Sequence, residues 1–223
     1  MIRVFTGFDE REAPGFHTFV SGLIRRASKP VAIHPLASMG LPEGSNTFTL
    51  SRFLVPWLCG FKGHAIFLDG ADMVILEDIA KLDHLFDPAY AVQVVKHPDY
   101  SPQNLRKYIG TEMECEQSSY SRKNWMSCAI YNCEHSAWFG MTPQAVAMKT
   151  PMQLLQLQDF LDEEIGELPP EWNVVIDEQQ SDVQAKILHW SNGIPPFPHY
   201  RDARRSKTWF KEFEQVTHSR QEG

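Results

Sequence analysis

Short apolar runs alternate with segments of helical periodicity along most of the chain. In segment 13–28, apolar side chains from Phe16 to Ile24 recur every three or four residues, which predicts one buried helix face. The run at residues 65–68 is continuously apolar, as in a central strand that is buried on both faces. The pattern therefore favours a protein built from both helices and strands.

The complete pattern predicts an α/β fold. We predict strands at residues 2–5, 31–36, 65–68, 90–95, 127–131 and 187–189, with a shorter one within 168–176, and helices within 13–28, 45–60, 143–149, 152–161 and 206–216. The first strand, helix and strand have the spacing of a parallel unit with a right-handed crossover. We therefore expect a mostly parallel central sheet flanked by helices. Residues 96–123 are polar and lack periodicity, which predicts a long loop with a functional role or high mobility.

Composition narrows the class of protein. The chain has 223 residues, of which 43% are hydrophobic, and this size suits a single domain spanning residues 1–223. The net charge of −7 argues against a nucleic-acid partner. No apolar run has the length of a transmembrane segment, and the four cysteines lack the spacing of a zinc knuckle. We expect reduced thiols and a cytoplasmic protein.

Two aspartates follow the apolar run at residues 65–68. Asp69 and Asp72 are separated by Gly70 and Ala71, and the glycine allows a sharp turn. A divalent cation that bridges these carboxylates and a diphosphate would satisfy both charges. A solvated turn with a local hydrogen bond from an aspartate explains the same pair. The pair alone does not decide between the two.

Other polar residues follow predicted strands. His189 ends a late strand, and imidazole is a good ligand for Mn²⁺, although a lone histidine at a strand end more often has a structural role. A basic segment, Arg122–Trp125, precedes the strand that leads to Asn132, and it could neutralise a diphosphate or form a basic turn. The glycine patterns of phosphate loops and dinucleotide sites and the Gly-x-Ser-x-Gly elbow are absent, which argues against ordinary kinases, NAD enzymes and serine hydrolases of that type.

Taken in order, several segments resemble glycosyltransferases of the GT-A fold, specifically bacterial and phage proteins similar to family 8. The segments that carry the resemblance are 6–13, 48–56, 66–72, 122–125 with 131–133, 170–173 and 189–193. The match spans nearly the whole chain. It implies a donor-nucleotide half at about residues 1–95 and an acceptor half, with a late metal ligand, at about 96–223.

The resemblance implies a role for each matching residue. The metal ligands would be Asp69, Asp72 and His189, holding Mn²⁺ or Mg²⁺. The donor would be bound by Thr6, Gly7, Asp9, Arg52, Asp69, Gly70, Lys123, Asn124 and Gly193. Arg52, Asn132 and Asp162 would act at the reacting sugar.

The implied reaction moves a sugar from a nucleoside diphosphate sugar, with a UDP-sugar favoured, to a glycan or other hydroxyl acceptor. Family 8 implies retention of the anomeric configuration. Two alternatives remain, namely a non-catalytic member that binds nucleotide sugars or glycans, and a nucleotidyltransferase.

Two features depart from the family pattern. The acidic motif has two intervening residues, so either the strand end bulges to present Asp72 or the metal site is altered. The lysine that the family carries shortly after the late histidine is missing, and Pro195 and Pro196 stand there. Neutralisation of the diphosphate then falls to the metal with Lys123, Arg122 or Arg52.

Overall fold

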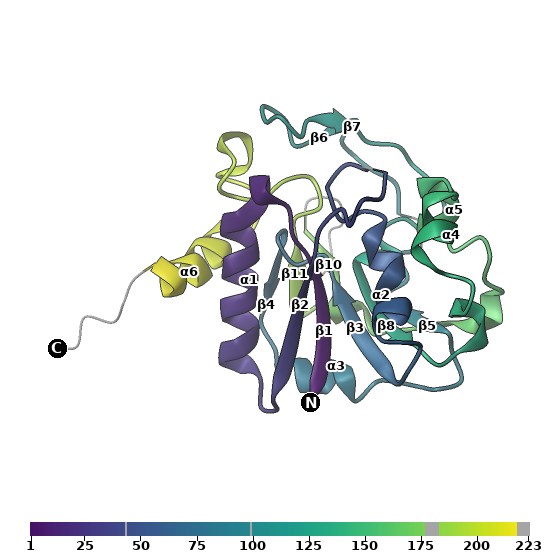
Figure 1. Ribbon diagram of the computed structural model, residues 1–223. Coiled ribbons are helices and arrows are strands. Elements are labelled where there is room, and N and C mark those ends of the chain that lie inside the picture. Colours follow the sequence, from purple (N-terminus) through teal and green to yellow (C-terminus); the bar gives the residue numbers. More distant parts are fainter. Residues whose placement is uncertain (43, 99, 177–182, 218–223) are drawn as a thin grey trace.

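A six-stranded sheet runs through the middle of the molecule, in a computed structural model that describes residues 1–42, 44–98, 100–176 and 183–217 (Figure 1). In spatial order the strands are β2 (Val31–Leu36), β1 (Ile2–Gly7), β3 (His64–Leu68), β8 (Cys128–Asn132), β5 (Val92–Val94) and β9 (Ile165–Glu167). β8 runs antiparallel to both of its neighbours, and the other five strands are parallel. The predicted mostly parallel sheet is confirmed.

Two smaller sheets complete the strand structure. One has the order β10 (Val174–Val175), β11 (Ile187–His189) and β4 (Met73–Ile75), with β11 antiparallel to β4. The other is a two-stranded pair of β6 (Arg106–Lys107) and β7 (Cys115–Glu116). This pair lies within the stretch for which the sequence predicts a loop.

Helices cover the sheet on both faces, as the continuously apolar β3 requires. The helices are α1 (Ala13–Arg26), α2 (Val55–Leu58), α3 (Ile79–Asp83), α4 (Pro143–Ala147), α5 (Pro151–Leu155) and α6 (Ser206–Thr217). Ile66 and Leu68 of β3 join a cluster with α1 and α3, whereas Phe67 joins a cluster with the segment before α2. No helix in the described residues is long and apolar enough to cross a membrane.

The C-terminal helix α6 packs beside α1 (Figure 1). Its Trp209 is completely buried. Glu212 forms ion pairs with Arg25 at 2.6 Å and Arg26 at 2.7 Å, so these two arginines hold α6 in place. The buried face of α1 carries Phe19 and Leu23, which pack against strands of the central sheet. Ile24 is 59% exposed, which corrects its predicted place in that face.

Candidate active site

The turn between β3 and β4 carries the two aspartates. Asp69 donates its backbone N–H to Ser127 at 2.9 Å, and the Met73 N–H closes the turn on the Gly70 carbonyl at 2.8 Å. Gly70 has φ of +85°, and a Cβ there would lie 1.9 Å from Thr6 Oγ1. Gly70 therefore permits the turn that accommodates the extra residue, because a larger residue would be strained and would clash.

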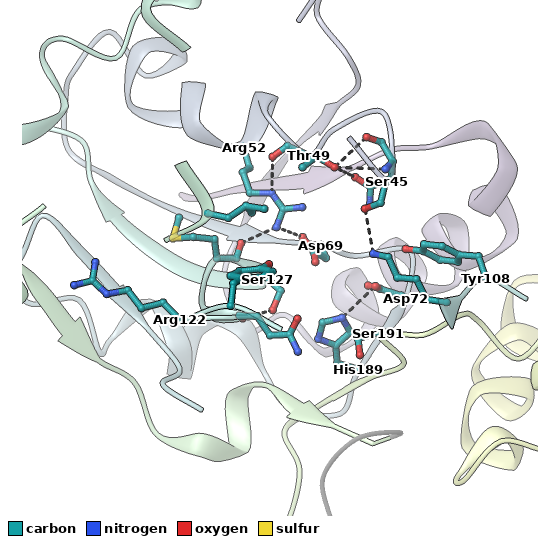
Figure 2. A pocket seen from close by; sticks show the side chains of 16 residues that line it. Ser45, Thr49, Arg52, Asp69, Asp72, Tyr108, Arg122, Ser127, His189 and Ser191 are labelled. Carbon is teal, nitrogen blue, oxygen red and sulfur yellow. Dashed lines mark hydrogen bonds and ion pairs between the residues drawn. The ribbon is translucent and has the colours of Figure 1, made fainter. Parts of the chain in front are cut away.

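His189 reaches this turn through strand pairing. It lies opposite Met73 in the antiparallel pair of β11 and β4. Met73 directly follows Asp72 in the chain, so the pairing brings His189 close to Asp72. His189 Nε2 lies 3.1 Å from Asp72 Oδ2, and one potential ligand atom each from Asp69, Asp72 and His189 fall within 4.8 Å of one another. All three side chains are buried and converge on one pocket (Figure 2).

Asn173 fixes the orientation of the His189 ring. The Asn173 Nδ2 donates to the Asn124 carbonyl at 3.2 Å and to Ser127 Oγ at 2.8 Å. Its Oδ1 therefore faces His189 Nδ1, at 2.9 Å, and accepts the Nδ1 proton. In a neutral ring the Nε2 lone pair then points at the Asp72 carboxylate, and a proton or a cation must lie between these two acceptors.

The surroundings of the cluster are strongly acidic. Asp72 Oδ1 and Glu12 Oε1 are buried and have no hydrogen-bond partner among the described residues. Burial raises the pKa of Glu12 well above its usual range, and the neighbouring Asp72 and Asp9 raise it further. Burial also raises the pKa of Asp69, opposed by the charge of Arg52. These unpartnered oxygens and an oriented imidazole are the donor set that a divalent cation would satisfy.

Arg52 is fixed on the other side of Asp69. Its Nη1 lies 2.7 Å from Asp69 Oδ1 and donates to the Met126 carbonyl at 3.0 Å. The guanidinium also lies between two aromatic rings, 5.3 Å from Phe48 and 5.1 Å from Phe67. Arg52 is only 5% exposed, and these contacts hold its guanidinium in one orientation.

An open, mostly polar pocket joins these groups. The lining residues are Ser45, Asn46, Thr49, Arg52, Asp69, Asp72, Lys107, Tyr108, Tyr120, Arg122, Asn124, Met126, Ser127, Leu155, His189 and Ser191. Lys107, Tyr108 and Tyr120 come from the polar stretch 96–123. The sequence indicated a functional loop there but did not single out these residues.

The basic segment Arg122–Trp125 contributes two of the residues that line the pocket, Arg122 and Asn124. Asn124 lines the pocket with φ of +62°, and its Nδ2 is buried with no hydrogen-bond partner among the described residues. Arg122 lines the pocket too, but its guanidinium points away from Asp69 and pairs with the exposed Asp162 (Figure 2). Lys123 donates to the Ser118 carbonyl at 2.6 Å and is not among the lining residues.

Four residues predicted to bind the donor, namely Thr6, Gly7, Asp9 and Gly193, pack against other parts of the protein. Thr6 and Gly7 are in contact with Gly70 and with the Phe48 ring, respectively. The Asp9 carboxylate accepts hydrogen bonds from Arg11 and from the Thr47 N–H, at 3.1 Å. Gly193 is packed against the Tyr200 ring. None of these four residues is among those that line the pocket.

The position of Asn132 corrects one expectation. β8 pairs antiparallel with β3, so Cys128 lies beside Leu68 whereas Asn132 lies beside His64. The sheet edge that carries Asp69 therefore meets the start of β8, and Asn132 lies at the opposite edge. Its Nδ2 donates to the Pro88 carbonyl at 3.1 Å. Asn132 does not reach the pocket and has no place in a catalytic site there.

Comparison with known proteins gives one relative with clear sequence similarity. Protein CDI of Arabidopsis thaliana is 33% identical over 229 residues, covering 96% of this chain and 86% of the plant protein. The chain belongs to the protein CDI family. No model of a known protein family matches it.

Solved structures place this CDI family member among glycosyltransferases in fold. Galactosyltransferase LgtC, solved with donor and acceptor sugar analogues, has a TM-score of 0.66 at 11% identity, covering 99% of this chain and 98% of LgtC. Glycosyltransferase GlyE of Streptococcus pneumoniae has a TM-score of 0.63 at 12% identity over 97% of this chain. The bifunctional glycosyltransferase WbbM has a TM-score of 0.58 at 13% identity over 86% of this chain.

The predicted GT-A-like glycosyltransferase fold is thus confirmed. The chain spans 63% of the length of GlyE and 46% of WbbM, and the low identities establish the fold alone. Membership of family 8 stays a prediction.

Proposed function

We propose that this chain is a metal-dependent glycosyltransferase. It transfers a sugar from a nucleoside diphosphate sugar, with UDP-sugars as the first donors to test, to a hydroxyl group of a glycan or other acceptor. The observation that carries the proposal is the convergence of Asp69, Asp72 and His189 in a polar pocket. The cluster lies beyond the carboxyl end of β3, where α/β folds bind ligands.

The residues of the pocket have separate tasks in this proposal. Asp69, Asp72 and His189 hold a divalent cation, and the imidazole favours Mn²⁺ over Mg²⁺. When bound, the cation neutralises the diphosphate oxygens of the donor. Asn173 keeps His189 Nε2 directed at the site, and Arg52 holds the Asp69 carboxylate in place.

In the reaction, the bond between the anomeric carbon and the diphosphate oxygen breaks, and its electron pair leaves with the nucleoside diphosphate. The acceptor oxygen forms the new bond to the same carbon and loses its proton to a base or to solvent. Retention of configuration, which family 8 would imply, belongs to this proposal. Asn124, with its buried and unpartnered Nδ2, is a candidate donor to sugar hydroxyls.

The experiment is a turnover assay with a panel of nucleoside diphosphate sugars, measuring released nucleoside diphosphate with added Mn²⁺ or excess chelator. We expect release only with the metal, and a loss of at least about 100-fold in Asp72→Ala. Asp202→Asn, at an exposed position, is the matched control and should retain full turnover. Full turnover in Asp72→Ala or in chelator would contradict the metal assignment, and donor binding without turnover would favour the non-catalytic alternative.

A further inference from the structure

Three cationic side chains line the pocket, and two of them are already engaged by the protein. Arg52 pairs with Asp69 and donates to the carbonyls of Thr49 and Met126. Arg122 pairs with Asp162 and donates to the carbonyls of residues 156 and 157. Both guanidinium groups are therefore held in place by internal acceptors, and part of their hydrogen-bonding capacity is already used.

Lys107 is the third cation, and its situation differs. Its Nζ donates to Ser45 Oγ at 3.1 Å and lies 4.9 Å from the centre of the Tyr108 ring. In the described parts of the chain it forms no ion pair. An ammonium has three N–H donors, so Lys107 can keep Ser45 as a partner and still bind an anion.

The charge of Lys107 acts on the acidic end of the pocket. It lowers the pKa of Glu12, against the larger effects of burial and of Asp72 and Asp9, and it also lowers the pKa of Asp69. The ammonium thus lies within electrostatic reach of the Asp69–Asp72–His189 cluster, and it lines the same pocket. A ligand that bridged Lys107 and a cation held by the cluster would therefore be anionic.

Lys107 lies in the two-stranded pair of β6 and β7, and hydrogen bonds from the residues that follow β6 hold this hairpin in place. The backbone N–H of Tyr108 donates to the Asn192 carbonyl at 2.7 Å. The backbone N–H of Ile109 donates to Tyr200 Oη at 3.0 Å. Tyr108 is 2% exposed. Figure 1 shows β6 and β7 at the upper end of the molecule. These contacts tie the hairpin to the loop that follows His189.

We propose that Lys107 binds the diphosphate of the donor and stabilises the departing nucleoside diphosphate; this inference rests on the proposed function. The loop from Ser191 to Pro198 contains no lysine or arginine, and the hairpin bonded to that loop supplies the cation instead. As the bond to the anomeric carbon breaks, negative charge grows on the diphosphate oxygen. The positive charge of Lys107 neutralises that charge.

The test is calorimetric binding of nucleoside diphosphates and monophosphates to the full chain with Mn²⁺ present. The probes are the diphosphates and monophosphates of uridine, guanosine, adenosine and cytidine. Lys107→Ala should weaken diphosphate binding roughly 10- to 100-fold while changing monophosphate binding less, and Lys107→Arg should recover part of the loss. Arg106→Ala, which removes an exposed neighbour paired with Glu114, is the matched control and should bind as the wild type does.

The outcomes separate this inference from the proposed function. If the wild type prefers a diphosphate and Lys107→Ala keeps the same ratio of diphosphate to monophosphate affinity, the role of Lys107 is overturned and the proposed function stands. An equal weakening of both ligands by Lys107→Ala would indicate a structural role and also overturns it. If the wild type binds none of the four diphosphates, the proposed function itself fails, and this inference fails with it.

Discussion

Asp72 and His189 face each other with 3.1 Å between Oδ2 and Nε2, although 117 positions separate them in the sequence. Two adjacent strands, β4 and β11, bring them together, and the Asn173 side chain fixes which nitrogen of the ring faces the carboxylate.

Replacing Asn173 should weaken metal binding without removing a ligand. In Asn173→Ala the His189 Nδ1–H loses its acceptor, so the ring is free to turn or change tautomer. We expect Mn²⁺ affinity to fall about 10- to 100-fold. Asn173→Asp keeps an acceptor for Nδ1 and should bind Mn²⁺ more tightly than the alanine variant. Equal affinities in wild type and Asn173→Ala, measured by calorimetry, would contradict the orienting role.

A side chain at Gly70 should disturb the acidic turn. In Gly70→Ala the new Cβ would meet Thr6 Oγ1 at 1.9 Å, at a φ of +85°. We expect the free energy of unfolding to fall by about 2–4 kcal/mol in urea titrations. Gly40→Ala is the matched control, since Gly40 has φ of +75° and open space around it, and it should lose about 1–2 kcal/mol. A loss at Gly70 no larger than the loss at Gly40 would show that the close contact does not matter.

Removing Arg52 should destabilise the chain through Asp69. Arg52→Ala leaves the buried Asp69 carboxylate without its ion-pair partner. We expect a loss of about 3–5 kcal/mol in the free energy of unfolding. Arg52→Ala combined with Asp69→Asn removes the unpaired charge and should be more stable than Arg52→Ala alone. If the double variant is instead the less stable of the two, the stability that Arg52 confers comes from its stacking on Phe48 and Phe67.

The contact of α6 with α1 should make stability depend on acid pH. Burial raises the pKa of Glu212, but hydrogen bonds from Arg26 and Arg25 outweigh it and leave the pKa below its ordinary value of 4.5. The folded state therefore gains stability from this carboxylate above pH 4.5, and the gain is lost as the pH falls through the lowered pKa.

Glu212→Gln should accordingly be less stable than wild type near neutral pH, with the difference shrinking as the pH falls below 4.5. Urea unfolding at several pH values measures this difference. Glu163→Gln, at an exposed position, serves as the control and should show little difference at any pH. A difference between Glu212→Gln and wild type that does not depend on pH would contradict the ion pairs.

The sequence predicted most of the sheet because its strands are defined by local pattern. β2 has the predicted bounds, and the continuously apolar β3 is buried on both faces. Asp69, Asp72 and His189 were singled out together because the ordered motifs resemble a known family, and the structure brings their side chains together. Asn132 was misplaced because the direction of a strand is set by its pairing, and β8 proved to be antiparallel to β3.

Other site residues left no readable signal in the sequence. Lys107 lies in a strand of two residues, too short to show any periodicity, and its position depends on hydrogen bonds to Asn192 and Tyr200. Glu12 precedes α1 like many ordinary acidic residues, and its burial beside the acidic turn comes from the close packing of Gly15 against Ala71. Such tertiary contacts cannot be inferred from one sequence.

The central claim is that Asp69, Asp72 and His189 together hold a divalent cation, and direct Mn²⁺ binding tests it. Electron paramagnetic resonance of free Mn²⁺ during a titration with UDP present would measure the affinity of wild type, Asp72→Asn, His189→Ala and the Asp202→Asn control. We predict one bound Mn²⁺ per chain in wild type and control, with affinity at least about tenfold lower in the two site variants. Equal Mn²⁺ affinity in all four proteins, or no binding by the wild type, would contradict the account.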